Sequence, residues 1–203
     1  GKKRFEKRPD KTDLELIQTI EEQDIPYLVP ADPLPNGDKT ADPLSVGITH
    51  LHHLYPRRNL LTVAAYVDQC RQSRVSSEER NALLWAATGV AEGSSKLNRE
   101  RITGLPSKLA GTLYVGSTIR ETNAITFLSH KIEKLANAWR NRMASNGPLV
   151  TTQSSSQTQL QDDESDYIFT DPPFGGNLMY SELNFVWEAW LRVFTNNQEE
   201  AVV

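Results

Sequence analysis

The chain has 203 residues, of which 38% are hydrophobic and 24% charged, and this balance excludes a wholly disordered protein. Its net charge of -4 lacks the strong basic excess that by itself indicates a nucleic-acid-binding protein. The single cysteine, Cys70, excludes a disulfide framework within the chain and a four-cysteine zinc site, so we expect a cytoplasmic location. No apolar run approaches the roughly 20 residues that cross a bilayer, so we expect no membrane partner.

Residues 1–47 are predicted to form an irregular lead-in. Prolines between positions 26 and 35 interrupt any long helix, because proline lacks the amide hydrogen that a helix interior needs. Leu14, Leu16 and Ile17 could support one short helix before them.

Residues 48–148 are predicted to be a mainly helical inserted region. Apolar residues fall on one face of a helix over 59–71. A second helix begins at Ser76, which has the spacing of a capping box with Glu79, and Gly93 is one of its expected stops.

Residues 93–111 are predicted to form a basic, glycine-bearing loop, the best candidate for contact with DNA phosphates. Its four basic residues are Lys96, Arg99, Arg101 and Lys108. A short strand over 112–115 and a long amphipathic helix over 121–144 are expected to follow, and Gly147-Pro148 ends that helix.

Residues 149–203 are predicted to be part of a catalytic core. The expected elements are a strand at 149–151, a polar loop at 152–164, a buried parallel strand at 166–170 and a helix at 181–194. Because helix and strand alternate here, the sequence predicts an α/β fold with an open, mostly parallel sheet.

The tetrapeptide Asp171-Pro172-Pro173-Phe174 directly follows the last predicted strand, at the end where ligands of such sheets bind. An exocyclic amine of a nucleobase is a poor nucleophile, because its lone pair is delocalised into the ring. The carboxylate of Asp171 and the carbonyl of Pro172 could accept the amine hydrogens, and two successive prolines hold that carbonyl in place. Phe174 could stack on a base that has been flipped out of the duplex.

The tetrapeptide matches the Asp/Asn/Ser-Pro-Pro-Tyr/Phe motif of amino-methyltransferases. The run from Tyr167 to Asn177, with the helical residues 180–184 and 187–191, resembles bacterial adenine-specific DNA methyltransferases. Residues 55–61 are similar to an aromatic-x-Arg-Asn-Leu element of the same group. The resemblance implies a Rossmann-like fold, S-adenosylmethionine as cofactor, DNA as partner and the adenine amino group as acceptor. It also implies direct in-line transfer without a covalent intermediate or a metal, in a restriction-modification or related defence system.

Carried over by position, the residues of the tetrapeptide are the catalytic matches, and four more are expected to bind substrate beside the pocket: Gly175, Tyr180, Ser181 and Glu182. The chain departs from the family because it has no Phe-x-Gly-x-Gly cofactor loop. The Gly89-x-x-x-Gly93 spacing lacks the preceding strand and aromatic residue. We therefore expect a fragment of a Rossmann-like enzyme that is inactive alone, with the cofactor loop upstream of Gly1.

Other readings of these residues stay open. The same tetrapeptide serves methylation of cytosine amines, RNA bases or a protein glutamine, and the chain could instead be a non-catalytic DNA-binding or assembly module. Arg57 and Arg58 could contact phosphates or cap neighbouring structure.

For two further groups of residues, the sequence favours a structural role over a functional one. His50, His52 and His53 have no carboxylate or cysteine at ligand spacing, which disfavours a metal site. The aromatic residues of the last helix have the helical spacing of core residues rather than of a base-stacking platform; they are Trp187, Trp190 and Phe194.

Overall fold

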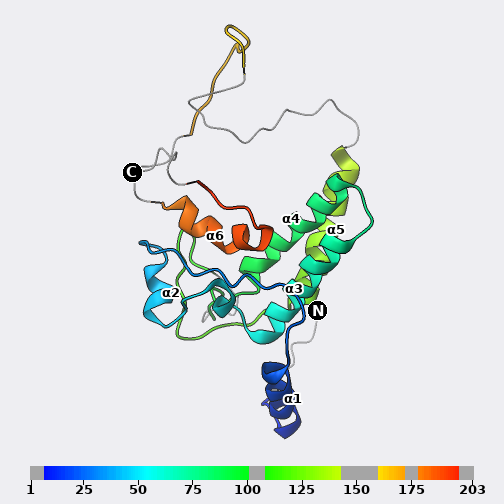
Figure 1. Cartoon of the computed structure of the whole chain (residues 1–203), viewed down its shortest axis with the longest axis vertical. Coiled ribbons are helices and arrows are strands. Elements are labelled where there is room, and N and C mark those ends of the chain that lie inside the picture. Colours follow the sequence, from blue (N-terminus) through cyan, green and yellow to red (C-terminus); the bar gives the residue numbers. More distant parts are fainter. Residues whose placement is uncertain (1–6, 101–107, 143–159, 172–177, 197–203) are drawn as a thin grey trace.

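The computed structural model describes residues 7–100, 108–142, 160–171 and 178–196, and their regular elements are helices (Figure 1). In chain order these are α1 (Lys11–Glu22), α2 (Ala41–Ser45), the 3-10 turn η1 (Leu51–Leu54), α3 (Arg57–Gln72), α4 (Ser77–Gly93), α5 (Ala124–Arg142) and α6 (Tyr180–Leu191). None of the helices in the described ranges is both long and apolar enough to cross a bilayer.

The predicted α/β, Rossmann-like fold is wrong for the part of the chain that the structure describes, which contains no strand and no sheet. The pairing found there is limited to two isolated bridges, Pro33 with His50 and Arg99 with Ile119. Residues 112–115 are irregular, and the predicted strand at 149–151 lies outside the described residues.

The predicted buried strand at 166–170 is irregular and open to solvent. Tyr167, Ile168 and Phe169 are 79%, 75% and 80% exposed. A strand needs a neighbour to pair its backbone amides and carbonyls, and an apolar run alone does not provide one. The preference of these residues for β-strands is therefore not enough to make a strand of residues 166–170.

The long helices agree with their sequence signals. Ser76 accepts a hydrogen bond from the Glu79 amide (3.2 Å) and its own amide donates to the Glu79 carboxylate (2.9 Å), which is the expected capping box. α4 ends at Gly93, and α3 and α5 lie within two or three residues of their predicted bounds where these are described. α1 begins with a second capping box, made by Asp10 and Asp13, and lies at one end of the bundle, where it contacts α3 (Figure 1).

The core forms where α4 packs against α3, α5 and α6. Fully buried residues from three of these helices meet there, among them Val63, Val90 and Val186. Gly93 permits the close approach of α5, because a Cβ at this position would overlap the ring of Phe127. The core therefore fixes α6, the helix that follows the Asp-Pro-Pro-Phe motif, against the rest of the bundle.

Candidate functional site

The candidate site is the amino-terminal end of α6, which the Asp-Pro-Pro-Phe motif precedes. Asp171 is exposed and lies in an irregular segment. The next four site residues, Pro172, Pro173, Phe174 and Gly175, lie outside the described residues. The structure thus describes the carboxylate before the motif's prolines and the helix after the motif.

The first turn of α6 holds the three remaining predicted substrate residues in different surroundings. Tyr180 is 43% exposed, and Ser181 is half-buried. Glu182 is buried at 8% exposure, and its Oε2 accepts hydrogen bonds from the amide of Lys39 (2.8 Å), the amide of Thr40 (3.1 Å) and the hydroxyl of Thr40 (3.3 Å). The Glu182 carboxylate therefore faces an earlier segment of the chain.

The segment that receives Glu182 is the turn at residues 37–40, which leads into α2. The single proton of the Thr40 hydroxyl is shared between the Gly37 carbonyl (3.1 Å) and Glu182 Oε2 (3.3 Å), and the Ala41 amide donates to the Gly37 carbonyl (3.1 Å). A Cβ at position 37 would overlap the Glu182 carboxylate, so glycine is needed for this approach. The turn presents two successive amides to one carboxylate oxygen, an arrangement that stabilises a buried negative charge.

The far end of α6 packs against the segment that precedes α3. Trp190 is 2% exposed, and its indole Nε1 donates to the hydroxyl of Tyr55 at 3.0 Å. The two rings meet edge to face, with centroids 5.7 Å apart. Burial raises the pKa of Tyr55, so its hydroxyl is neutral at physiological pH. The contact confirms that Trp190 belongs to the core, whereas Phe194 is 44% exposed and Trp187 is half-buried.

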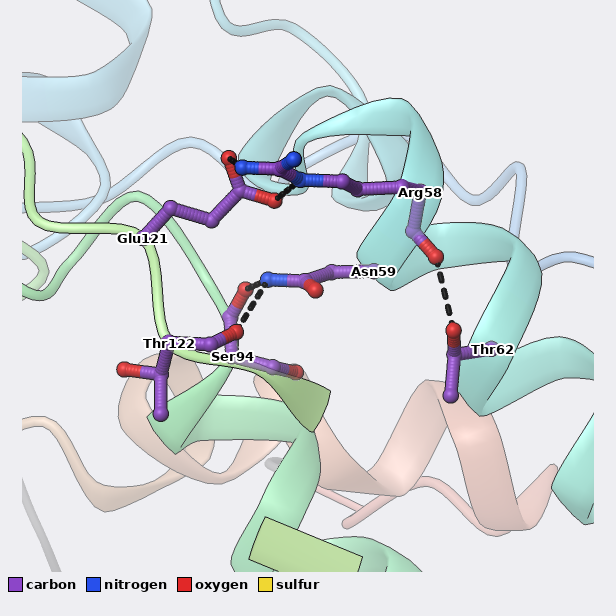
Figure 2. Close-up of polar contacts among 6 residues, drawn as sticks. All are labelled: Arg58, Asn59, Thr62, Ser94, Glu121 and Thr122. Carbon is purple, nitrogen blue, oxygen red and sulfur yellow. Dashed lines mark hydrogen bonds and ion pairs between the residues drawn. The ribbon is translucent and has the colours of Figure 1, made fainter. Parts of the chain in front are cut away.

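This contact also brings together the two described segments on which the family resemblance rests, residues 55–61 and α6. The start of α3 is in turn tied to the residue that follows α4 and to the segment that precedes α5, as Figure 2 shows. The side-chain amide of Asn59, which is buried, donates to the backbone carbonyls of Ser94 (2.9 Å) and Thr122 (3.0 Å). One side chain thus joins three parts of the bundle.

Arg57 and Arg58 both contact neighbouring structure. Arg57 donates to the backbone carbonyl of Gln23, and Arg58 forms an ion pair with Glu121, with its Nη2 2.7 Å from Glu121 Oε2 (Figure 2). Of the two roles left open by the sequence, the described contacts favour the structural one.

The four cations predicted to contact DNA do not form one exposed patch in the described residues. Lys96 donates to the carbonyl of His53 at 2.8 Å, and Lys108 forms an ion pair with Glu92. Arg99 is half-buried, and Arg101 lies outside the described residues. Any DNA contact by Lys96 or Lys108 would have to compete with these intramolecular bonds.

The three histidines form a cluster on and beside η1. Their ring centroids lie 4.3 to 5.6 Å apart, and the Thr49 hydroxyl lies 2.9 Å from Nδ1 of His50. Burial, followed by the neighbouring imidazoles, lowers the pKa of His52. Within the described ranges, no group of three or more histidine, cysteine, aspartate or glutamate side chains is arranged to hold a metal ion.

The two glycines at positions 89 and 93 are not arranged to hold S-adenosylmethionine. Gly89 and Gly93 lie inside α4, where Lys131 and Phe127 of α5 approach them closely, so they do not form an open glycine loop. No protein-family model, curated protein or solved structure matches the chain. What the described site offers is the exposed carboxylate of Asp171, an acceptor that lies ahead of the fixed helix α6.

Sequence reasoning did not find Lys39, Thr40 or Gly37, the partners of Glu182. No local signal identifies them, because the turn at 37–40 is polar like the rest of the lead-in and lies more than 140 residues before Glu182.

Proposed function

We propose that this chain supplies the acceptor-amine part of a DNA methyltransferase that modifies the amino group of adenine. The observation that carries the proposal is the tetrapeptide Asp171-Pro172-Pro173-Phe174 directly ahead of a helix that is held at both ends, by Glu182 and by Trp190. A motif that must present oxygen acceptors to a poor nucleophile benefits from such support, because ordering the acceptors beforehand lowers the cost of the reaction.

In this proposal, the Asp171 carboxylate accepts a hydrogen bond from the exocyclic amine and favours tetrahedral character at its nitrogen. Phe174 provides a flat face for the extruded base, which offsets part of the few kcal/mol that base flipping costs. Asp171 is exposed and therefore accessible to a substrate. Because Gly89 and Gly93 do not form a glycine loop, we propose that S-adenosylmethionine is held by groups outside the described residues.

The proposal is tested with the natural protein in which this sequence occurs. Transfer of labelled methyl from S-adenosylmethionine to DNA is measured for the wild type, for Asp171→Ala and for the matched control Asp166→Ala, which removes another exposed carboxylate of the same segment. We expect Asp171→Ala to lower the rate by about 100-fold or more while DNA binding is retained, and Asp166→Ala to change it less than about twofold. Equal rates for the wild type and Asp171→Ala would overturn the proposal.

Mass spectrometry of the modified nucleosides identifies the acceptor. N6-methyladenine is the expected product. Methylated cytosine amine, methylated RNA or a methylated protein glutamine would assign the same motif to another substrate. DNA binding without any methylation would instead favour a non-catalytic DNA-binding or assembly module.

A further inference from the structure

Glu182 is a buried charged side chain in the described part of α6, and its bonding partners lie far away in sequence. It sits in the first turn of the helix that follows the acceptor motif, and its carboxylate contacts Lys39 and Thr40. A carboxylate removed from water is tolerated only when hydrogen bonds replace its hydration. Here, two backbone amides do so on a single oxygen, and the Thr40 hydroxyl shares its one proton between that oxygen and the Gly37 carbonyl.

The turn at 37–40 is a rigid partner for this carboxylate. Its hydrogen bonds to the Gly37 carbonyl fix the direction of the amides, and Thr40 is fully buried. Just before α6 begins, Leu178 lies against Gly111, with its Cδ2 3.0 Å from where a Cβ of residue 111 would stand. The chain is therefore held at two points directly after the acceptor motif.

We propose that Glu182 is a positioning residue, which fixes the place where the Asp-Pro-Pro-Phe motif enters α6. This inference rests on the proposed function. Glu182 acts through the turn at 37–40 rather than on the substrate, because its carboxylate is buried and its Oε2 accepts from two backbone amides of that turn. Its loss displaces the motif relative to the bound base, and a displacement of about 1 Å is enough to slow an enzyme strongly.

Four variants of the natural protein test the role, and methylation kinetics are the readout. Glu182→Gln removes the charge and keeps the shape, whereas Thr40→Val removes the hydroxyl that lies between Glu182 Oε2 and the Gly37 carbonyl. Thr40→Ser restores that donor and is the conservative rescue. Glu188→Gln is the matched control, because Glu188 also lies in α6 but accepts from Thr195 instead.

We expect Glu182→Gln to lower kcat by about tenfold with a KM for DNA within about twofold of the wild type, because the motif is misplaced while DNA binding is unchanged. Thr40→Val should also lower kcat. The double variant Thr40→Val/Glu182→Gln should have a kcat no lower than that of Glu182→Gln alone. Thr40→Ser and Glu188→Gln should both have the kcat of the wild type. If Glu182→Gln does not fold, Thr40→Val and its rescue by Thr40→Ser carry the same test.

The two proposals fail in different ways. If the wild type transfers no methyl group, or if Asp171→Ala is fully active, the proposed function fails and the role of Glu182 fails with it. If Asp171→Ala is inactive but Glu182→Gln and Thr40→Val keep the wild-type kcat, the positioning role alone is overturned. A change confined to the KM for DNA also overturns it.

Discussion

Replacing Tyr55 with phenylalanine removes one hydroxyl group from the core and leaves the aromatic ring in place. Tyr55 is 4% exposed, and its hydroxyl accepts the hydrogen bond from Trp190 Nε1 at 3.0 Å. Since the ring remains, the cavity left behind is small. The cost comes from the lost hydrogen bond and from a buried indole N–H without an acceptor, so we expect Tyr55→Phe to lower the free energy of unfolding by about 1–3 kcal/mol.

Urea unfolding followed by far-ultraviolet circular dichroism measures this loss, because the described chain is helical. The midpoint should fall while the slope m stays unchanged, since the surface exposed on unfolding is nearly the same. Tyr167→Phe is the control: Tyr167 is 79% exposed, so this change should stay within about 0.5 kcal/mol of the wild type.

A double-mutant cycle with Trp190→Phe isolates the contact between the two side chains. We expect a coupling energy of about 1 kcal/mol, because each single change already breaks the same hydrogen bond. If Tyr55→Phe costs as little as Tyr167→Phe, or costs the same with and without the indole, the buried hydrogen bond does not stabilise the docking of α6.

Three further changes test other parts of the bundle. Asn59→Ala removes the amide that donates to two backbone carbonyls, and should lower the free energy of unfolding by about 2 kcal/mol in the same urea titration; an unchanged midpoint contradicts its bridging role. Because burial lowers the pKa of His52 from its ordinary 6.5, the unfolded chain binds more protons, and stability is lost as the pH falls through about 6.5. When Tm is measured against pH, His52→Asn should reduce the fall in Tm at low pH. Parallel curves of Tm against pH for the wild type and His52→Asn would show that His52 is not the group responsible. Ser76→Ala removes the cap of α4 and should cost about 1 kcal/mol, while Ser77→Ala, one residue later, should cost less; equal costs exclude the cap as the cause.

The sequence predicts the long helices of this chain well, because their signals are local. The three- and four-residue spacing of apolar residues predicts α5, and the pairing of Ser76 with Glu79 predicts where α4 begins. These features depend only on residues within one or two turns, so they need no knowledge of the rest of the structure.

The predicted strands fail for the opposite reason. A short apolar run such as 166–170 has the composition of a buried strand, but its stability depends on neighbouring strands elsewhere in the polypeptide. None is present in the described ranges, and the run is exposed. The same holds at the candidate site, where the partners of Glu182 lie in a distant turn that the local sequence does not identify.

The exposed segment at 160–171 has a practical consequence for handling the protein in solution. It contains five carboxylate side chains and no lysine or arginine, around the consecutive apolar residues Tyr167, Ile168 and Phe169. Such an apolar run favours intermolecular β-pairing, and charged neighbours oppose it through mutual repulsion. Added salt screens this repulsion, so concentrated samples should aggregate as the ionic strength rises, and a polar substitution at Ile168 should delay it.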